Sequence, residues 1–473
     1  MENLSLFWFA ALRIGALGDR VRLPARPGRL LGFALLVLAV PTALMAQKPT
    51  NKTAPGGQPV IAPSATPAKQ FAAARAAPAD SFAAADALAD AAPSSAEQSV
   101  PALAAYLARA GSDDITRARA LYRWIAGHID YDVNGFRSGN YGDLSPEGVL
   151  RSRSSVCEGY ASLAEALGSA MGLQVQVVPG WSKGYGYTSG QRFDGPTNHA
   201  WNAVRIDGQW RLMDATWGAG YLDERTQFVR RFQEHYFLTA PDAFVFDHLP
   251  HDPQWQLLER PISAAEYENL VYLRPMFFLA GFRIGSHPHA RIAAVDRVTV
   301  TLGVTQPVQV AASVVDAATD QSLAEELTFV QVGATEARID ALFPRAGDYL
   351  LRVFAKPLGA DGSLSWVLDY RVQASRGASD AAFPMAYGSF GARGATLLEP
   401  LSGVLQAGRT YRFRLRAPGA LDVAVVAGGK WTHLAASGGE FSGDVPASAG
   451  SVVVYAKYEA GADYTGLLRY TGR

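Results

Sequence analysis

Apolar positions along the chain change their spacing at about residue 273. Before it, Val100, Leu103 and Leu107 recur at helical intervals, and so do the apolar residues from Ile115 to Ile129 and from Tyr160 to Met171. After it, short runs alternate apolar and polar residues between Gly and Pro breaks, which is typical of strands that bury one face. We therefore predict an α+β domain followed by all-β domains.

The β-rich half of the chain contains two similar modules. The stretch Phe343–Lys356 recurs loosely as Val445–Lys457, and the offset of about 100 residues is the size of one β-sandwich. With Ser375–Ala382 as the linker, we predict one sandwich over residues 273–375 and another over residues 383–473, used for display or docking. The clearest predicted strands of the first module are Val298 to Leu302, Val308 to Val314, Leu327 to Val332, Tyr349 to Ala355 and Trp366 to Val372.

The first 46 residues have the order of an export signal. Four arginines between positions 20 and 29 precede the apolar run Leu30–Val40, and small residues then lead to the expected cleavage site, Ala46–Gln47. The run is short for a membrane span, so we favour a cleaved signal over a retained N-terminal anchor, and a secreted or periplasmic protein. Residues 47–95, rich in Ala and Pro, are expected to be a disordered tether in which Ala83–Ala92 is at most transiently helical.

Composition narrows the classes of function. Lys plus Arg equals Asp plus Glu at 43 each, so no net charge favours nucleic acid as a partner. The single cysteine excludes disulfides within the chain and every zinc or iron–sulfur site built from several cysteines. In an oxidising compartment such a cysteine is either buried and inert or retained for chemistry, and its surroundings favour chemistry.

Cys157 is expected in the first turn of a helix. Ser155 and Glu158 fit a capping box, with Ser155 as N-cap, and Gly172 marks the end of the apolar repeat that follows. The first turn has unpaired backbone N–H groups and the positive end of the helix dipole, both of which favour a thiolate. Such settings lower a cysteine pKa from about 8.5 to roughly 3.5–7.5.

A predicted hairpin brings a histidine to an aspartate downstream of this cysteine. The strand Ala200–Ile206 runs into Asp207–Gly208, a strong signal for a two-residue turn. Counting back from that turn sets Trp201 opposite Asp214. Since side chains alternate between faces, His199 then becomes a diagonal neighbour of Asp214 on one face of the hairpin. A thiol, an imidazole and a carboxylate are the residue set of a cysteine nucleophile, its base and the group that orients the base.

Several motifs surround these three residues in a fixed order. They are Tyr122-Arg123-Trp124-Ile125, Ile129-Asp130-Tyr131-Asp132, Val156-Cys157-Glu158-Gly159-Tyr160, Asn198-His199-Ala200-Trp201-Asn202, Met213-Asp214-Ala215-Thr216-Trp217, Tyr236-Phe237-Leu238-Thr239, Asp247-His248-Leu249-Pro250 and residues 252–258. With them, residues 115–258 resemble a transglutaminase-like domain, a relative of papain-type thiol hydrolases. The resemblance is strongest to the kyphoscoliosis peptidase-like subgroup and its bacterial members.

The resemblance implies a papain/transglutaminase-like catalytic domain over residues 96–272, followed by immunoglobulin-like sandwiches. It also implies that Cys157, His199 and Asp214 are the catalytic triad and that no cofactor is needed. We expect a protein or peptide substrate, including proteins of the cell envelope, with hydrolysis of peptide or side-chain amides favoured over cross-linking. Membrane contact is expected only through a retained N-terminal anchor.

Four questions stay open or are set aside at this point. A catalytically silent scaffold or binding module would also suit a tether and two sandwiches. The backbone N–H of Cys157 would supply part of an oxyanion hole, and Asn140 and Tyr141 are weak candidates for the second donor. A metal site is not expected, although His235, His248, His251, Asp247 and Asp252 lie close in sequence. Trp181, Tyr185 and Tyr187 are expected either to line a substrate groove or to pack under their loop.

Overall fold

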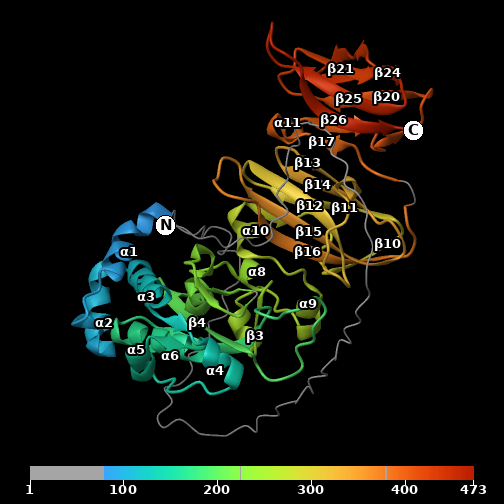
Figure 1. Ribbon diagram of the computed structural model, residues 1–473. Helices are drawn as coiled ribbons and strands as arrows, with labels where there is room; N and C mark the ends of the chain where they lie inside the picture. Colours follow the sequence, from blue (N-terminus) through green and yellow to red (C-terminus); the bar gives the residue numbers. More distant parts are fainter. Residues whose placement is uncertain (1–78, 224, 379–380) are drawn as a thin grey trace, which may run out of the picture. The chain divides into compact units, whose positions relative to one another are not determined.

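The computed structural model describes residues 79–223, 225–378 and 381–473 (Figure 1). The predicted export signal, its cleavage site and most of the predicted tether lie outside these residues. Among the residues that are described, no helix is both long enough and apolar enough to cross a membrane. A domain with helices and a small sheet comes first, and two β-sandwiches follow it, as the spacing of apolar positions predicts.

The first domain, called here the helical domain, is built on a four-stranded antiparallel sheet. Its strand order is β5–β4–β3–β8. The strands are β3 (Val175–Ser182), β4 (His199–Ile206), β5 (Gln209–Met213) and β8 (His248–Pro250). The helices are α1 (Ala83–Asp90), α2 (Val100–Leu107), α3 (Asp114–His128), α4 (Val133–Ser138), α5 (Pro146–Ser152), α6 (Cys157–Ala170), α7 (Ala215–Ala219), α8 (Pro241–Phe244) and α9 (Ala264–Asn269).

The strand order brings the ends of four strands together on one side of this sheet. Because every neighbouring pair is antiparallel, the start of β4 lies beside the end of β5 and the end of β3. The start of β8 lies beside the end of β3 as well, with His248 paired to Ser182. Residues at these four ends, although separated by many residues in sequence, therefore meet in space.

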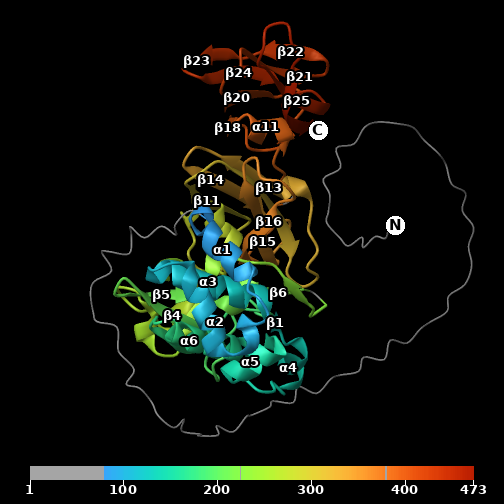
Figure 2. The same cartoon turned by 90° about the vertical axis from the view of Figure 1, so that its left-hand side faces the viewer.

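Helix α1 forms inside the stretch that composition assigns to a tether. It packs along α3 (Figure 2). Arg119 of α3, whose side chain is 1% exposed, pairs with Asp86 of α1 and with Glu234, each at 2.6 Å. The prediction that Ala83–Ala92 is only transiently helical is therefore wrong. The ion pairs of the buried Arg119 side chain fix this helix. Their acidic partners lie 33 and 115 positions from Arg119 in sequence, so local composition gives no sign of them.

Helix α6 begins at Cys157 as predicted, but its cap differs. The N-cap is Val156, without a side-chain hydrogen bond, so the predicted capping box is wrong. Ser155 instead pairs with Tyr131 in the short parallel ladder of β1 (Asp130–Tyr131) with β2 (Ser154–Ser155). At the other end, the N–H groups of Gly172 and Leu173 bond to carbonyls of the last turn, which is the Schellman arrangement that a glycine at φ +79° permits.

Each sandwich packs two sheets face to face over an apolar core. The first pairs sheet β10–β16–β15–β12 with β13–β14–β11–β9, and the second pairs β17–β26–β25–β21–β22 with β18–β20–β24–β23. The longer strands are β11 (Arg297–Val304), β12 (Val308–Asp316), β13 (Thr328–Val332), β14 (Glu336–Leu342), β15 (Gly347–Pro357), β16 (Ser365–Ala374), β20 (Thr410–Arg416), β21 (Asp422–Ala427), β24 (Glu440–Pro446), β25 (Gly450–Lys457) and β26 (Thr465–Gly472). The shorter ones are β9 (Phe282–Ile284), β10 (Arg291–Ala294), β17 (Met385–Ala386), β18 (Thr396–Glu399), β22 (Lys430–His433) and β23 (Ala435–Ser437).

The repeat found in sequence corresponds to equivalent strands. Strand β15 pairs with the next strand, β16, and its register shifts between Val353 and Phe354. Strand β25 pairs likewise with β26, and its register shifts between Val454 and Tyr455, at the matching place in the repeat. The five strands predicted for the first sandwich are confirmed as β11, β12, β13, β15 and β16. Strand β14 was not among them.

Candidate active site

His199 and Asp214 meet across the β4–β5 hairpin, in the predicted register. Ile206 pairs with Gln209 and Asn202 with Met213, so the next pair outward would set Trp201 against Asp214. The diagonal contact follows: the Nε2–H of His199 donates to Oδ2 of Asp214 at 2.8 Å. Both side chains are buried. The hairpin register read from the Asp207–Gly208 turn is therefore confirmed.

Asp214 is held from two sides. Its Oδ1 accepts the backbone N–H groups of Thr216 and Trp217 at 2.8 and 3.1 Å, which caps α7, while Oδ2 faces His199. Burial alone would raise the pKa of Asp214. The charge of His199 and the hydrogen bonds from His199 and His248 outweigh burial and hold that pKa well below its usual range. Asp214 is thus a fixed, ionised carboxylate.

Cys157 reaches the same place from α6. It is the first residue of the helix, it is half-buried, and its side chain lies near enough to His199 to raise the pKa of the imidazole. Gly159 lets the helix start lie close to β2, because a Cβ there would stand 2.0 Å from Oγ of Ser155. Asn202 of β4 ties the sheet to the helix by donating from Nδ2 to the carbonyl of Ala161 at 3.0 Å. The structure thus brings Cys157 beside the hydrogen-bonded pair of His199 and Asp214.

The electrostatics of this chain favour a charged imidazole. Burial lowers the pKa of His199, but the charge of Asp214, the hydrogen bond to Asp214 and the nearby Cys157 side chain outweigh it and raise that pKa to about 10. The rings of Trp217 and Trp201 lie 5.3 and 5.9 Å from the imidazole and limit its contact with water. Charges in such a low-dielectric setting interact more strongly than in water. An imidazole beside a thiol can take the proton of that thiol, which leaves a thiolate next to an imidazolium.

A second histidine, which the sequence reasoning set aside, also binds Asp214. His248 Nε2 lies 3.1 Å from Oδ2 of Asp214, and its Nδ1 lies 2.6 Å from Oδ1 of Asp247. His199, Asp214 and His248 offer donor atoms within 4.8 Å of one another, a set that a metal ion could use. However, each histidine already shares a proton with the same carboxylate oxygen. We therefore interpret the cluster as a hydrogen-bond network.

The other histidines of the sequence cluster have separate surroundings. His235 stacks on Phe278 with ring centroids 4.9 Å apart, and burial lowers its pKa to about 4. His251 is exposed and lies beside Trp181. Asp252 caps a short helical turn, accepting the N–H of Gln254. Within the described part of the chain, His235, His251 and Asp252 are not in the group that a metal could use.

The remaining candidates are either exposed or packed under the loop between β3 and β4. Asn140 and Tyr141 are exposed, and the charges of Cys157 and Tyr141 both act on the buried hydroxyl of Tyr131, whose pKa is raised mainly by burial. Trp181 donates to loop carbonyls, and Tyr187 stacks on Phe193, so both pack under the loop.

Tyr185 differs from its two loop neighbours. It is 50% exposed, its hydroxyl bonds to Thr226, and its ring lies 6.5 Å from the exposed ring of Phe136. Since Phe136 in turn contacts Tyr131, these aromatic rings connect the exposed surface to the surroundings of Cys157. Tyr185 and Phe136 are thus exposed aromatic side chains near Cys157.

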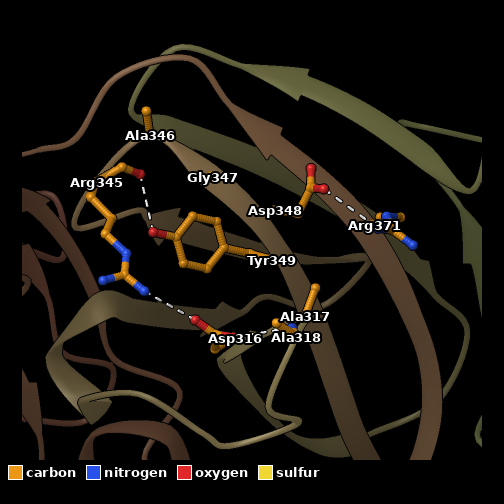
Figure 3. A pocket seen from close by; sticks show the side chains of 9 residues that line it. All are labelled: Asp316, Ala317, Ala318, Arg345, Ala346, Gly347, Asp348, Tyr349 and Arg371. Atoms are coloured by element: carbon orange, nitrogen blue, oxygen red, sulfur yellow. Dashed lines mark hydrogen bonds and ion pairs between the residues drawn. The ribbon is translucent and has the colours of Figure 1, made fainter.

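A separate pocket lies in the first sandwich (Figure 3). Arg345 pairs with Asp316 at 3.3 Å, and Arg371 pairs with Asp348 at 3.4 Å. The hydroxyl of Tyr349 donates to the carbonyl of Arg345 at 3.0 Å. The charged groups of the pocket are thus matched with one another, and we assign it no chemistry.

Comparison with known families agrees with this geometry. Residues 101–215 match the model of the transglutaminase-like superfamily, and residues 264–385 match the model of the KY-like, immunoglobulin-like domain. The chain carries a transglutaminase-like domain and a KY-like immunoglobulin-like domain. The predicted family resemblance and fold class are therefore confirmed. We call the helical domain the transglutaminase-like domain from here on.

Curated relatives are similar over part of their length. The chain is 35% identical to mouse kyphoscoliosis peptidase over 263 residues, which are 55% of this chain and 38% of that protein. It is 33% identical to the human kyphoscoliosis peptidase over 282 residues, 59% of this chain and 41% of that protein. A solved structure described as a TGase is 20% identical with a TM-score of 0.20, covering 34% of this chain and 37% of that one. The chain thus matches about two fifths of the length of these peptidases.

Proposed function

We propose that this protein is an exported cysteine hydrolase that acts on peptide or side-chain amide bonds. The observation that supports the proposal best is that Cys157 lies beside His199, which hydrogen-bonds to the ionised Asp214. A nucleophile, a base and an orienting acid in contact are the arrangement of a thiol hydrolase. The similarity to proteins named peptidases points in the same direction.

In the proposed acylation step, the thiolate of Cys157 attacks the carbonyl carbon of the amide. The negative charge that develops on the carbonyl oxygen is stabilised by the backbone N–H of Cys157, which as the first residue of α6 has no partner within the helix. The carbon–nitrogen bond then breaks. His199 gives its proton to the leaving nitrogen, an amine or ammonia departs, and a thioester on Cys157 remains.

In the second step, water attacks the thioester. His199 takes a proton from this water, the carbon–sulfur bond breaks, and the products are a carboxylic acid and the free Cys157 side chain. Asp214 holds the imidazole with Nε2 turned toward itself, which leaves Nδ1 for the thiol and the water. Replacing water by a primary amine would give cross-linking. We favour hydrolysis because it needs no second binding site for an amine.

Casein incubated with the full chain separates the possible reactions. New α-amino ends indicate peptide cleavage, ammonia release without amine uptake indicates side-chain hydrolysis, and uptake of dansylcadaverine indicates transfer to an amine. We expect one of the first two, lost in Cys157→Ala. None of the three products, together with slow iodoacetamide labelling of Cys157 below pH 7, would instead support a catalytically silent scaffold.

Export is a separate part of the proposal and has its own test. It rests on the arginines and the apolar run ahead of Ala46. N-terminal sequencing of the protein recovered from expressing cells should give Gln47 as the first residue. Cytosolic material that still begins with Met1 would contradict export with cleavage.

A further inference from the structure

His248 is buried between two carboxylates and has no part in the steps proposed above. Its ring is 1% exposed and sits at the start of β8, beside the end of β3. The Nε2 atom faces Asp214 at 3.1 Å, and the Nδ1 atom faces Asp247 at 2.6 Å. Both ring nitrogens therefore have a carboxylate partner.

These contacts determine the protonation of the ring. An ionised carboxylate accepts hydrogen bonds and donates none, so an imidazole bonded to two carboxylates must donate from both nitrogens. A ring with hydrogen on both nitrogens is an imidazolium. The second oxygen of Asp247 accepts the hydroxyl of Tyr236 at 3.0 Å, as expected of a carboxylate that only accepts. A positive charge is thus fixed at His248.

Aromatic rings hold His248 in this orientation. Phe244 stacks on it with centroids 4.0 Å apart and planes 18° apart. Trp217 and Trp201 lie at 4.5 and 4.9 Å. The imidazole cannot turn away from either carboxylate without displacing these rings, so the two hydrogen bonds are a fixed feature of the fold.

The charge at His248 acts on His199 through their shared partner. Both histidines bond to Oδ2 of Asp214, and their ring centroids are 5.3 Å apart. A like charge at this distance disfavours protonation of the neighbour. It also shares the carboxylate that would otherwise stabilise His199 alone. His199 must release its proton to the leaving nitrogen, and an imidazolium held too tightly would do so slowly.

We propose that His248 is a positioning residue that fixes Asp214 and limits how tightly His199 holds its proton. This role rests on the function proposed above. The other titratable groups of the described residues that interact with this network include Cys157 and Tyr160 from α6, Lys183 after β3, His235 and Tyr236 from the turn before α8, Tyr122 from α3, Tyr131 from β1, Tyr267 from α9 and Tyr272.

Among the groups around the network, His248 is the histidine that contacts Asp214 beside His199. Lys183 lies on the far side of Asp247, where its backbone N–H donates to the Asp247 carbonyl and its ammonium donates to the carbonyl of Leu270. Burial disfavours a charge on His235, whose pKa is about 4, so it is neutral above that pH. The tyrosines are neutral near pH 7, since burial raises the pKa of each. A change at His248 is therefore the direct way to alter the charge next to Asp214.

Two substitutions separate the contacts of His248. The amide nitrogen of His248→Gln can take the place of Nε2 and still donate to Asp214, but the charge and the bond to Asp247 are lost. The amide of His248→Asn takes the place of Nδ1 and keeps the bond to Asp247, but the charge and the bond to Asp214 are lost. His251→Gln, an exposed histidine just beyond the same strand, is the matched control.

The measurement is the rate of casein turnover between pH 4 and pH 12, on the full chain. The wild type should give a bell-shaped profile whose upper limb reports loss of the proton that His199 gives to the leaving nitrogen. We expect that limb to move up by about one pH unit in His248→Gln and further in His248→Asn. Casein turnover should fall about tenfold or more in both, and His251→Gln should match the wild type. A purely structural role would lower stability without moving the limb.

The possible failures are distinguishable. An upper limb that stays in place in the folded His248 variants would overturn the role of His248 and leave the proposed function intact. Iodoacetamide labelling of the wild type with one transition, near the pKa of a free thiol at about 8.5, would contradict the proposed function itself. A further test needs no variant: ¹⁵N NMR of histidine-labelled wild type should show both nitrogens of His248 protonated at pH 6–8. A neutral His248 ring in that range would overturn the inference.

Discussion

The transglutaminase-like domain and the sandwiches differ in what they bury. All but two of the buried polar or charged side chains of the described residues lie before residue 260, and the two exceptions are Gln331 and Asp340. The sandwiches instead fill their cores with aliphatic and aromatic residues, which alternate along the strands with more exposed positions. Burying a polar group costs free energy unless the group is hydrogen-bonded or paired. A need for apolar packing therefore does not explain why the first domain buries so many polar groups. The difference indicates that the proposed active site lies in the transglutaminase-like domain.

The buried pairs of the first domain also serve two separate purposes. Around Cys157 they set protonation, because His199, Asp214, His248 and Asp247 share protons in one line. Around Arg119 they join distant segments instead, since its guanidinium holds α1 and the turn containing Glu234. Substitutions in the two places should therefore affect different quantities.

The largest effect is expected at Asp214. Asp214→Asn keeps an oxygen that can cap α7 but removes the charge that stabilises protonated His199. Casein turnover should fall by about 10³–10⁴-fold, as is typical when the acid of a triad is replaced by its amide. Asp340→Asn is the matched change in the first sandwich, where the buried carboxylate pairs with Arg338 and Thr299. It should leave turnover unchanged, and equal losses in the two variants would contradict the division described here.

The next effect is on stability. Arg119→Met leaves Asp86 and Glu234 without their partner, and we expect the free energy of unfolding to fall by about 2–3 kcal/mol, below the 3–5 kcal/mol of fully buried pairs because both acids are partly exposed. Arg412→Ala in the second sandwich breaks an exposed pair with Asp444 and should cost less than about 1 kcal/mol. Urea denaturation of both variants gives the comparison. A similar small loss in both would mean that the buried pair does not hold α1.

The last effect depends on pH. Burial, partly offset by Asp247, lowers the pKa of Lys183 to about 7 from its usual 10.5. Between these values the unfolded chain binds a proton that the folded chain has lost, so the contribution of Lys183 to stability rises with pH. The stability of the wild type minus that of Lys183→Met should therefore increase from pH 7 to pH 10, by at most about 1.4 kcal/mol per unit.

The control for this pH effect is Lys430→Met, an exposed lysine of the second sandwich. It should change stability little at any pH. A stability difference that stays constant for Lys183→Met as well would mean that the folded protein keeps this ammonium charged.

The parts that could be predicted from sequence are those set by local rules. The Asp207–Gly208 turn determines the hairpin register, and the register alone places His199 beside Asp214. Gly172 ends α6 because its positive φ completes the cap. The domain order follows from the change in apolar spacing, since strand and helix periods differ.

The parts that were missed depend on contacts between distant residues. The sequence of α1 resembles that of a disordered tether, because the ion pair that stabilises this helix is made with Arg119 of another helix. His248 lies on a strand of three residues, and its pairing with β3 leaves no periodic pattern to detect. Ser155 reads as a helix cap, but the ladder with Tyr131 takes it into a strand. Local sequence locates the proposed nucleophile and its proposed base but not the second histidine that bonds to Asp214.

The central claim is that His199 activates Cys157, and the alkylation rate of Cys157 against pH tests it most directly. The wild type should react rapidly with iodoacetamide below pH 7, because the imidazolium stabilises the thiolate. His199→Ala should react at a comparable rate only as the pH approaches about 8.5, where a free thiol ionises. Identical profiles for the two proteins would contradict the account and leave the transglutaminase-like domain as a scaffold.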